Sequence, residues 1–260
     1  MQDRYIADEA KVNISSLEAE TVMKSTPVST VTSILGRIGI EYEEGLPKEA
    51  YIAAFKEEFC SEPKWVLLML PKMMLDFLME VWENPVVEMS EERWNYVEYL
   101  KIFGFLAYRM GNSISDEPNQ ILVVDEMKDR FYFLLKSRKS QKALSVYEEW
   151  EKIITGYMYY YGFIETRTLY SLFLKVSKKV VSYEEFILFI KCRSSMWAFG
   201  VILKDFTGKN EYFQYLSVEN ADLLLTYIRE HEELPYKPVK IEDLIYVSDA
   251  AGIDNRWSGV

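Results

Sequence analysis

Residue types that commonly perform catalysis or bind metals are few and scattered in this chain. His231 is the only histidine, in the polar segment "IREHEELP", and the only cysteines are Cys60 and Cys192. No H-x-x-x-H or C-x-x-C pair occurs, so the clustered ligands of a transition-metal site are missing. The motifs G-x-S-x-G, G-x-x-x-x-G-K-S/T and G-x-G-x-x-G are also absent. We therefore predict a non-enzymatic protein with no catalytic, cofactor-binding or metal-binding residues.

One pair of carboxylates leaves a different possibility open. Asp125 and Glu126, in "VVDEM", follow an apolar stretch and could help to bind a divalent cation. Acidic residues are also favoured in the first turn of a helix, where they interact with the helix dipole. We prefer the second interpretation, in which these two residues begin a helix.

The densest basic run is the candidate contact for nucleic acid or an acidic partner. Its members are Lys128, Arg130, Lys136, Arg138, Lys139 and Lys142. Three aromatic residues at 131–133 lie among them, and charge combined with stacking is typical of RNA or DNA contacts. The alternative is an amphipathic helix that buries Phe131, Leu134 and Leu135 and leaves its basic side chains in water. We favour that alternative.

The charge of the chain is unevenly distributed. The net charge is −11, with 11 Lys+Arg against 23 Asp+Glu in residues 1–127, 15 against 8 in residues 128–209, and 4 against 10 in residues 210–260. A basic middle between acidic ends can form a nucleic-acid surface, bind an acidic partner or pair with its own neighbours. The acidic ends would repel nucleic acid at long range, which weakens the first of these readings.

Length and composition indicate a folded protein of two compact units, with one large unit as the alternative. The chain has 260 residues, of which 49% are hydrophobic and 15% aromatic, which is enough for a substantial core. The two distant cysteines fit a reducing, cytoplasmic location, and the first residues lack the features of a signal peptide. The most apolar window, 65–82, contains Pro71 and three charged residues, so we read it as two short buried helices that meet at Pro71.

Helix caps and turns mark the elements that must position any site. In the N-terminal half we expect helices at 29–38, after Pro47 and after Ser90, a hairpin formed by 105–110 and 120–127, and a helix from about Asp125.

The C-terminal half shows clearer boundaries. Capping-box spacing predicts helices that begin after Ser145 and Ser182, and Thr166 is expected to cap the helix between them. The first of these helices should end at Gly162. A hairpin around "FTGKN" and a helix at 218–229 follow.

The predicted fold class is therefore α+β and mostly α-helical, with a helical N-terminal unit and a winged-helix-like C-terminal unit, each with a short β-hairpin. The second unit is called winged-helix-like because its expected order is three helices followed by a two-stranded wing. The predicted boundaries are a polar arm at 1–27, a helical domain at 28–142, a winged-helix-like domain at 143–235 and a C-terminal tail at 236–260.

The segments "YYYGFIETRTLYSLF", "VSYEEF" and "LPYKPVKIEDLIYVSDA" together resemble uncharacterised bacterial cytosolic proteins, some of which end in a cysteine-rich SEC-C zinc motif. The resemblance covers roughly residues 150–250, and it implies a helical, winged-helix-like fold without a known activity. This chain lacks the terminal cysteine and histidine cluster, so no zinc site is implied.

Two functional classes follow from these observations. In a winged helix the helix after Ser182 would face the DNA bases, yet Glu184 and Glu185 lie at its start and would meet phosphates unfavourably. We therefore predict a cytoplasmic interaction or regulatory module that binds protein and not membranes. The alternative is a nucleic-acid-binding transcriptional regulator that uses the winged helix and the 128–142 run.

Overall fold

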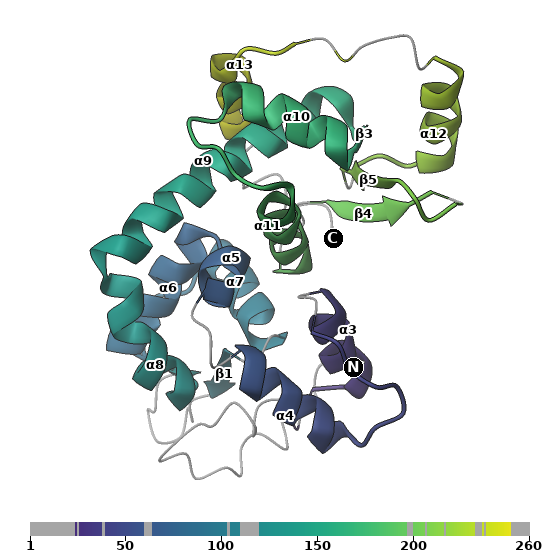
Figure 1. Ribbon diagram of the computed structural model, residues 1–260. Coiled ribbons are helices and arrows are strands. Elements are labelled where there is room, and N and C mark those ends of the chain that lie inside the picture. Colours follow the sequence, from purple (N-terminus) through teal and green to yellow (C-terminus); the bar gives the residue numbers. More distant parts are fainter. Residues whose placement is uncertain are drawn as a thin grey trace. The chain divides into compact units, whose positions relative to one another are not determined.

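The computed structural model describes residues 24, 26–37, 40–59, 64–102, 105–109, 120–196, 200–205, 207–215, 217–231, 236 and 238–250. Most of the expected N-terminal arm, the loop at 110–119 and the last ten residues lie outside this set. The chain divides into two compact units, Met1–Lys142 and Ala143–Val260. Each unit combines several helices with one small antiparallel sheet, which confirms the α+β, mostly helical class (Figure 1).

The described helices of the N-terminal unit are α3 (Val28–Arg37), α4 (Lys48–Phe59), α5 (Lys64–Met69), α6 (Lys72–Glu83), α7 (Glu91–Ile102) and α8 (Asp125–Lys136). Pro71 separates α5 from α6, as predicted, because proline fits the start of a helix but not its interior. Its carbonyl accepts from the N–H of Met74 and of Leu75, both at 3.1 Å. The predicted cap at Ser90 is also confirmed, since its hydroxyl accepts from the N–H of Arg93 at 3.2 Å.

The predicted N-terminal hairpin is confirmed as β1 (Leu106–Arg109) and β2 (Gln120–Val123), which pair antiparallel with Leu106 opposite Val123. Leu106, Ile121 and Val123 are buried, and α6 and α7 pack against the two strands. The pair is therefore anchored by one apolar side, as a two-stranded sheet requires.

Helix α9 (Arg138–Tyr161) begins earlier than predicted. Ser137 is the capping residue, because its hydroxyl accepts from the N–H of Ser140 at 3.2 Å. Ser145 is instead an exposed residue inside the helix. The capping box at Ser145 was wrong because Ser140 and Leu144 are both buried, so packing extends the helix toward its N-terminus.

The C-terminal unit continues from α9 with β3 (Phe163–Glu165), α10 (Thr166–Val176), α11 (Tyr183–Met196), β4 (Val201–Lys204), β5 (Glu211–Gln214), α12 (Ala221–Glu230) and α13 (Ile241–Ala250). The hairpin of β4 and β5 is confirmed. The short strand β3 was not predicted, and it pairs with β5, so that the sheet has the order β3–β5–β4.

Gly162 makes the corner between α9 and β3. Its φ of 67° is a left-handed conformation that favours glycine, and its N–H donates to the carbonyl of Met158 at 2.8 Å. Its own carbonyl accepts from the N–H of Tyr215 at 2.7 Å, which starts the pairing of β3 with β5. The predicted helix end at Gly162 is therefore confirmed, and it leads directly into a strand.

The other two caps expected in this unit, at Thr166 and Ser182, had different outcomes. The hydroxyl of Ser182 accepts from the N–H of Glu185 at 3.1 Å, which confirms that cap. Thr166 is not a cap, because it is the first residue of α10 and is buried, and its hydroxyl bonds to that of Tyr183 at 2.7 Å. Glu165 takes the capping position.

Residues 236–260, expected to form a tail, include helix α13. Leu244 of this helix is fully buried and lies directly against Gly156 of α9. Lys152 of α9 also pairs with Asp249 at 2.8 Å. The tail interpretation is therefore wrong for residues 241–250, because a helix with Leu244 buried is docked and not peripheral.

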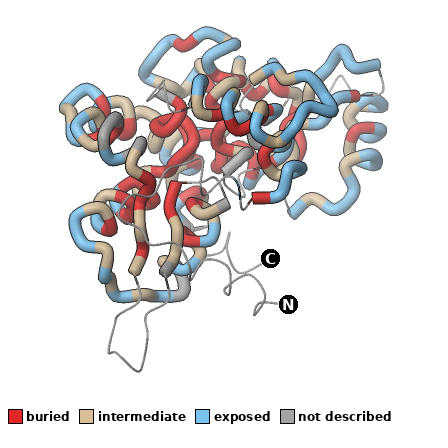
Figure 2. The backbone as a smooth tube through the Cα atoms, turned by 90° about the horizontal axis from the view of Figure 1, so that it is seen from below, coloured by how far each residue is buried: buried red, intermediate tan, exposed pale blue. Residues whose placement is uncertain are grey.

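Aromatic side chains form much of the core of the C-terminal unit. The ring of Trp150 meets those of Phe173 and Phe189 edge-on at 5.5 Å, and Phe173 also contacts Phe186 at 5.0 Å. These residues join α9, α10 and α11 into one packed layer, and buried positions such as these are red in Figure 2.

Candidate partner-binding surface

Helix α11 is the second helix after strand β3 and would be the reading helix of a winged helix. Its described residues include six buried ones, which are Phe186, Ile187, Phe189, Ile190, Cys192 and Arg193. Its exposed described side chains are Glu184, Glu185 and Lys191, and Leu188 between them is half-buried. The outer stripe of α11 is therefore acidic at its start and apolar in its middle.

Arg193 is the most unusual residue of α11, because its side chain is fully buried. Its Nε lies 3.6 Å from Oε2 of Glu151 on α9, and its guanidinium lies 5.4 Å from the ring of Phe189. Among the described residues none accepts a hydrogen bond from its three nitrogens. Burial lowers the pKa of Arg193, and the charge of Glu151 opposes this shift. Sequence patterns place Arg193 at the polar end of a helix and give no signal of this burial.

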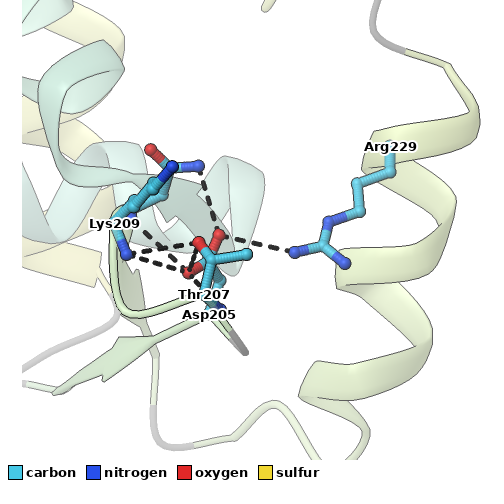
Figure 3. Close-up of polar contacts among 5 residues, drawn as sticks. Asp205, Thr207, Lys209 and Arg229 are labelled. Atoms are coloured by element: carbon cyan, nitrogen blue, oxygen red, sulfur yellow. Dashed lines mark hydrogen bonds and ion pairs between the residues drawn. The ribbon is translucent and has the colours of Figure 1, made fainter.

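The turn of the β4–β5 hairpin is organised by one carboxylate, that of Asp205, which is shown in Figure 3. Its Oδ1 accepts from the hydroxyl of Thr207 at 2.7 Å and from the N–H groups of Thr207 and Lys209 at 3.1 and 3.2 Å. Its Oδ2 accepts from the side-chain amide of Asn210 at 3.2 Å. Arg229 reaches from α12 to the same oxygen at 3.5 Å, so that Asp205 joins the turn to that helix.

The same contacts predict how the turn responds to acid. The Thr207 hydroxyl and the backbone N–H groups of Asn210, Thr207 and Lys209 hold the pKa of Asp205 below its ordinary value of 3.8. A lowered pKa means that the stabilisation is complete above the ordinary value and is lost as the pH falls through the folded-state pKa. We expect acid to shift the melting temperature of the wild type more than that of Asp205→Asn below pH 4. Thermal melts from neutral pH downward test this, and parallel curves for the two proteins would contradict it.

The predicted basic run extends over α8 and the start of α9. Lys136 pairs with Glu83 at 2.5 Å, and this carboxylate and Tyr132 raise the pKa of Lys136. Lys128 lies 3.8 Å from Asp125. The remaining described side chains of the run are exposed, and they are Arg138, Lys139 and Lys142. The side chain of Arg130 lies outside the described set. Lys128 and Lys136 thus have acidic neighbours within their own unit.

The other residues singled out from the sequence lie apart from one another. Asp125 is the first residue of α8, consistent with a first-turn role, while the side chain of Glu126 is not described. His231 is the C-cap residue of α12, where its Nδ1 donates to the carbonyl of Tyr227 at 2.9 Å. Cys192 is buried, and burial raises the pKa of its thiol to about 12. Within the described ranges, no group of three or more metal-ligating side chains comes together.

Comparison with protein-family models, curated proteins and solved structures finds no match to this chain. In the part of the chain that the structure describes, no helix is long and apolar enough to cross a membrane.

Proposed function

We propose that this protein is a non-enzymatic interaction or regulatory module, and that its C-terminal unit is a winged-helix-like domain that binds another protein. The order of elements supports the fold, because α9, β3, α10, α11, β4 and β5 follow one another as helix, strand, helix, helix and hairpin. The sheet order β3–β5–β4 adds to this support, since the first strand pairs with the last strand of the wing.

The exposed residues of α11 favour a protein partner over nucleic acid. A DNA-reading helix needs polar or basic side chains toward the base edges and phosphates. Here that position holds Glu184, Glu185 and the half-buried Leu188, with Lys191 near the far end. Carboxylates beside an apolar side chain suit a protein surface better than a phosphate backbone. The resemblance to cytosolic bacterial proteins supports a cytoplasmic location, while it implies no particular activity.

A nucleic-acid-binding regulator is the second candidate, and exposed basic side chains favour it. Arg138, Lys139 and Lys142 remain exposed on α9, and the wing exposes Lys204 and Lys209. Such residues can contact phosphates without reading bases, and this binding would weaken steeply with salt.

Binding measurements separate the two candidates. We expect the full chain to show no salt-sensitive binding to labelled duplex DNA or single-stranded RNA at physiological salt. A photoreactive side chain at Leu188 should cross-link a protein in cells, and nuclease treatment should not remove the product. The same group at Glu98, exposed on α7, is the matched control.

The opposite result would establish the regulator. Salt-sensitive binding of DNA or RNA that is weakened in the triple variant Lys136→Gln, Arg138→Gln, Lys139→Gln would contradict the protein-binding proposal. Removing basic side chains that contact phosphates lowers both the affinity and its dependence on salt.

A further inference from the structure

Strand β4 forms one edge of the three-stranded sheet and presents apolar side chains there. In the described part of the chain β4 pairs with β5 alone. Val201 is 39% exposed and Leu203 is 37% exposed, and both lie on β4. An exposed apolar edge strand is a template for another strand unless charges, proline or a bulge protect it. Lys204, at the end of β4, is its single charged residue.

The register of the hairpin shows which backbone groups face away from β5. The N–H of Asp205 donates to the carbonyl of Asn210 at 3.0 Å, and Leu203 lies opposite Tyr212. Backbone groups alternate in direction along an antiparallel strand. Val201, Leu203 and Asp205 therefore direct their N–H and C=O groups toward β5. Ile202 and Lys204 direct theirs outward, where an added strand would pair.

The edge is packed closely at both ends. At one end the turn is fixed by the hydrogen bonds of Asp205. At the other end, Gly200 has a φ of 149°, and a Cβ there would lie 2.6 Å from the carbonyl oxygen of Gln214. A strand that is already held in its paired shape loses little conformational freedom when it binds.

We infer that this edge pairs with the same edge of a second copy of the chain, antiparallel about a two-fold axis at Ile202. In this register Val201 lies opposite Leu203 of the second copy, and Leu203 lies opposite Val201 of the second copy. Both exposed apolar side chains of each copy thus gain an apolar neighbour. The pairing is self-complementary, as a two-fold interface requires.

Charge and burial disfavour two other registers. An axis at Lys204 would set the two lysines directly opposite each other, which is destabilising. An axis at Leu203 would set Val201 opposite Asp205, whose carboxylate is buried in the turn. The axis at Ile202 places the lysines of the two copies at opposite ends of the paired strands.

A four-residue edge makes a small interface, so the dimer should be weak and dependent on concentration. This inference does not depend on the proposed function, because a nucleic-acid-binding chain could pair through the same edge.

Sedimentation of the full chain over a range of concentrations tests the inference. Ile202→Pro removes an outward N–H and leaves the bonds to β5 intact, because proline is tolerated on that side of an edge strand. We expect it to lower the association constant at least about tenfold, since the two-fold axis makes each substitution act twice. Leu203→Glu should also weaken the dimer. Leu223→Glu, at an exposed position of α12, is the matched control and should leave the association constant unchanged.

Cross-linking tests the register itself in a Cys60→Ser background. Directly opposed residues in a hydrogen-bonded antiparallel pair have Cα atoms about 5.5 Å apart, which a disulfide can span. Ile202→Cys should therefore form a disulfide-linked dimer faster than Leu203→Cys. A monomer at every concentration, a dimer unaffected by Ile202→Pro, or faster cross-linking at position 203 would each overturn the inference.

Discussion

Replacing Glu151 with alanine is expected to lower the free energy of unfolding by about 3 to 5 kcal/mol, because it leaves a buried guanidinium without its countercharge. Arg193 is fully buried, and Nε lies 3.6 Å from the Glu151 carboxylate. Among described residues the nitrogens of Arg193 have no hydrogen-bond acceptor. The negative charge of Glu151 is therefore the main interaction that offsets the burial of the guanidinium. Urea denaturation of the full chain measures the loss.

Two control variants show whether the destabilisation in Glu151→Ala comes from breaking the buried ion pair or only from losing a carboxylate on α9. Glu149 lies on the same helix and pairs at 3.7 Å with Lys178, whose side chain is 81% exposed. Glu149→Ala should cost less than about 1 kcal/mol, as exposed pairs do. The double variant Glu151→Leu, Arg193→Met removes both charges and should be close to the wild type in stability. Equal losses for Glu151→Ala and Glu149→Ala would show that the buried pair has no special role.

Replacing Gly156 with valine is expected to detach helix α13 from α9. A Cβ at position 156 would lie 2.5 Å from the carbonyl oxygen of Leu244 and 2.7 Å from its Cα. Both are backbone atoms, so no rotation of a side chain can relieve the overlap, and overpacking of this kind costs about 1 to 3 kcal/mol or more. Even Gly156→Ala should destabilise, although alanine favours an isolated helix by about 1 kcal/mol.

The rate of hydrogen exchange at the amide of Leu244 reports whether α13 is docked on α9. In the wild type this N–H donates to the carbonyl of Lys240 at 3.1 Å, and exchange should become much faster in Gly156→Val. Gly36→Ala, within helix α3, is the matched control, because a Cβ there meets its nearest atom, the hydroxyl oxygen of Tyr42, at 3.8 Å. That variant should be as stable as the wild type or slightly more so. Unchanged exchange in Gly156→Val would disprove the close approach of the two helices.

Elements with local signals were predicted well from the sequence. Pro71 divides α5 from α6, and Ser90 and Ser182 cap α7 and α11, because these effects involve residues within one helical turn. Gly162 ends α9 for the same kind of local reason, its left-handed backbone. The hairpin of β4 and β5 was predicted from two runs of strand-favouring residues that flank the turn segment "FTGKN".

Choices between equivalent local signals could not be made from the sequence. Ser137 and Ser145 are both suitable caps, and the buried positions of Ser140 and Leu144 decide for Ser137. Thr166 has the chemistry of a cap, but its hydroxyl bonds to Tyr183 on another helix.

Tertiary structure alone decided three features that no local signal indicates. β3 has three residues and is a strand only because β5, about fifty residues later, supplies its hydrogen bonds. Helix α13 docks because Gly156, far away in the chain, leaves room for Leu244. Arg193 has the sequence position of a solvent-exposed helix end, and the packing of α11 on α9 places it beside Glu151. Local capping and turn chemistry determined where elements begin and end, whereas contacts between distant residues determined which surfaces are buried, because that burial exists only after the chain has folded.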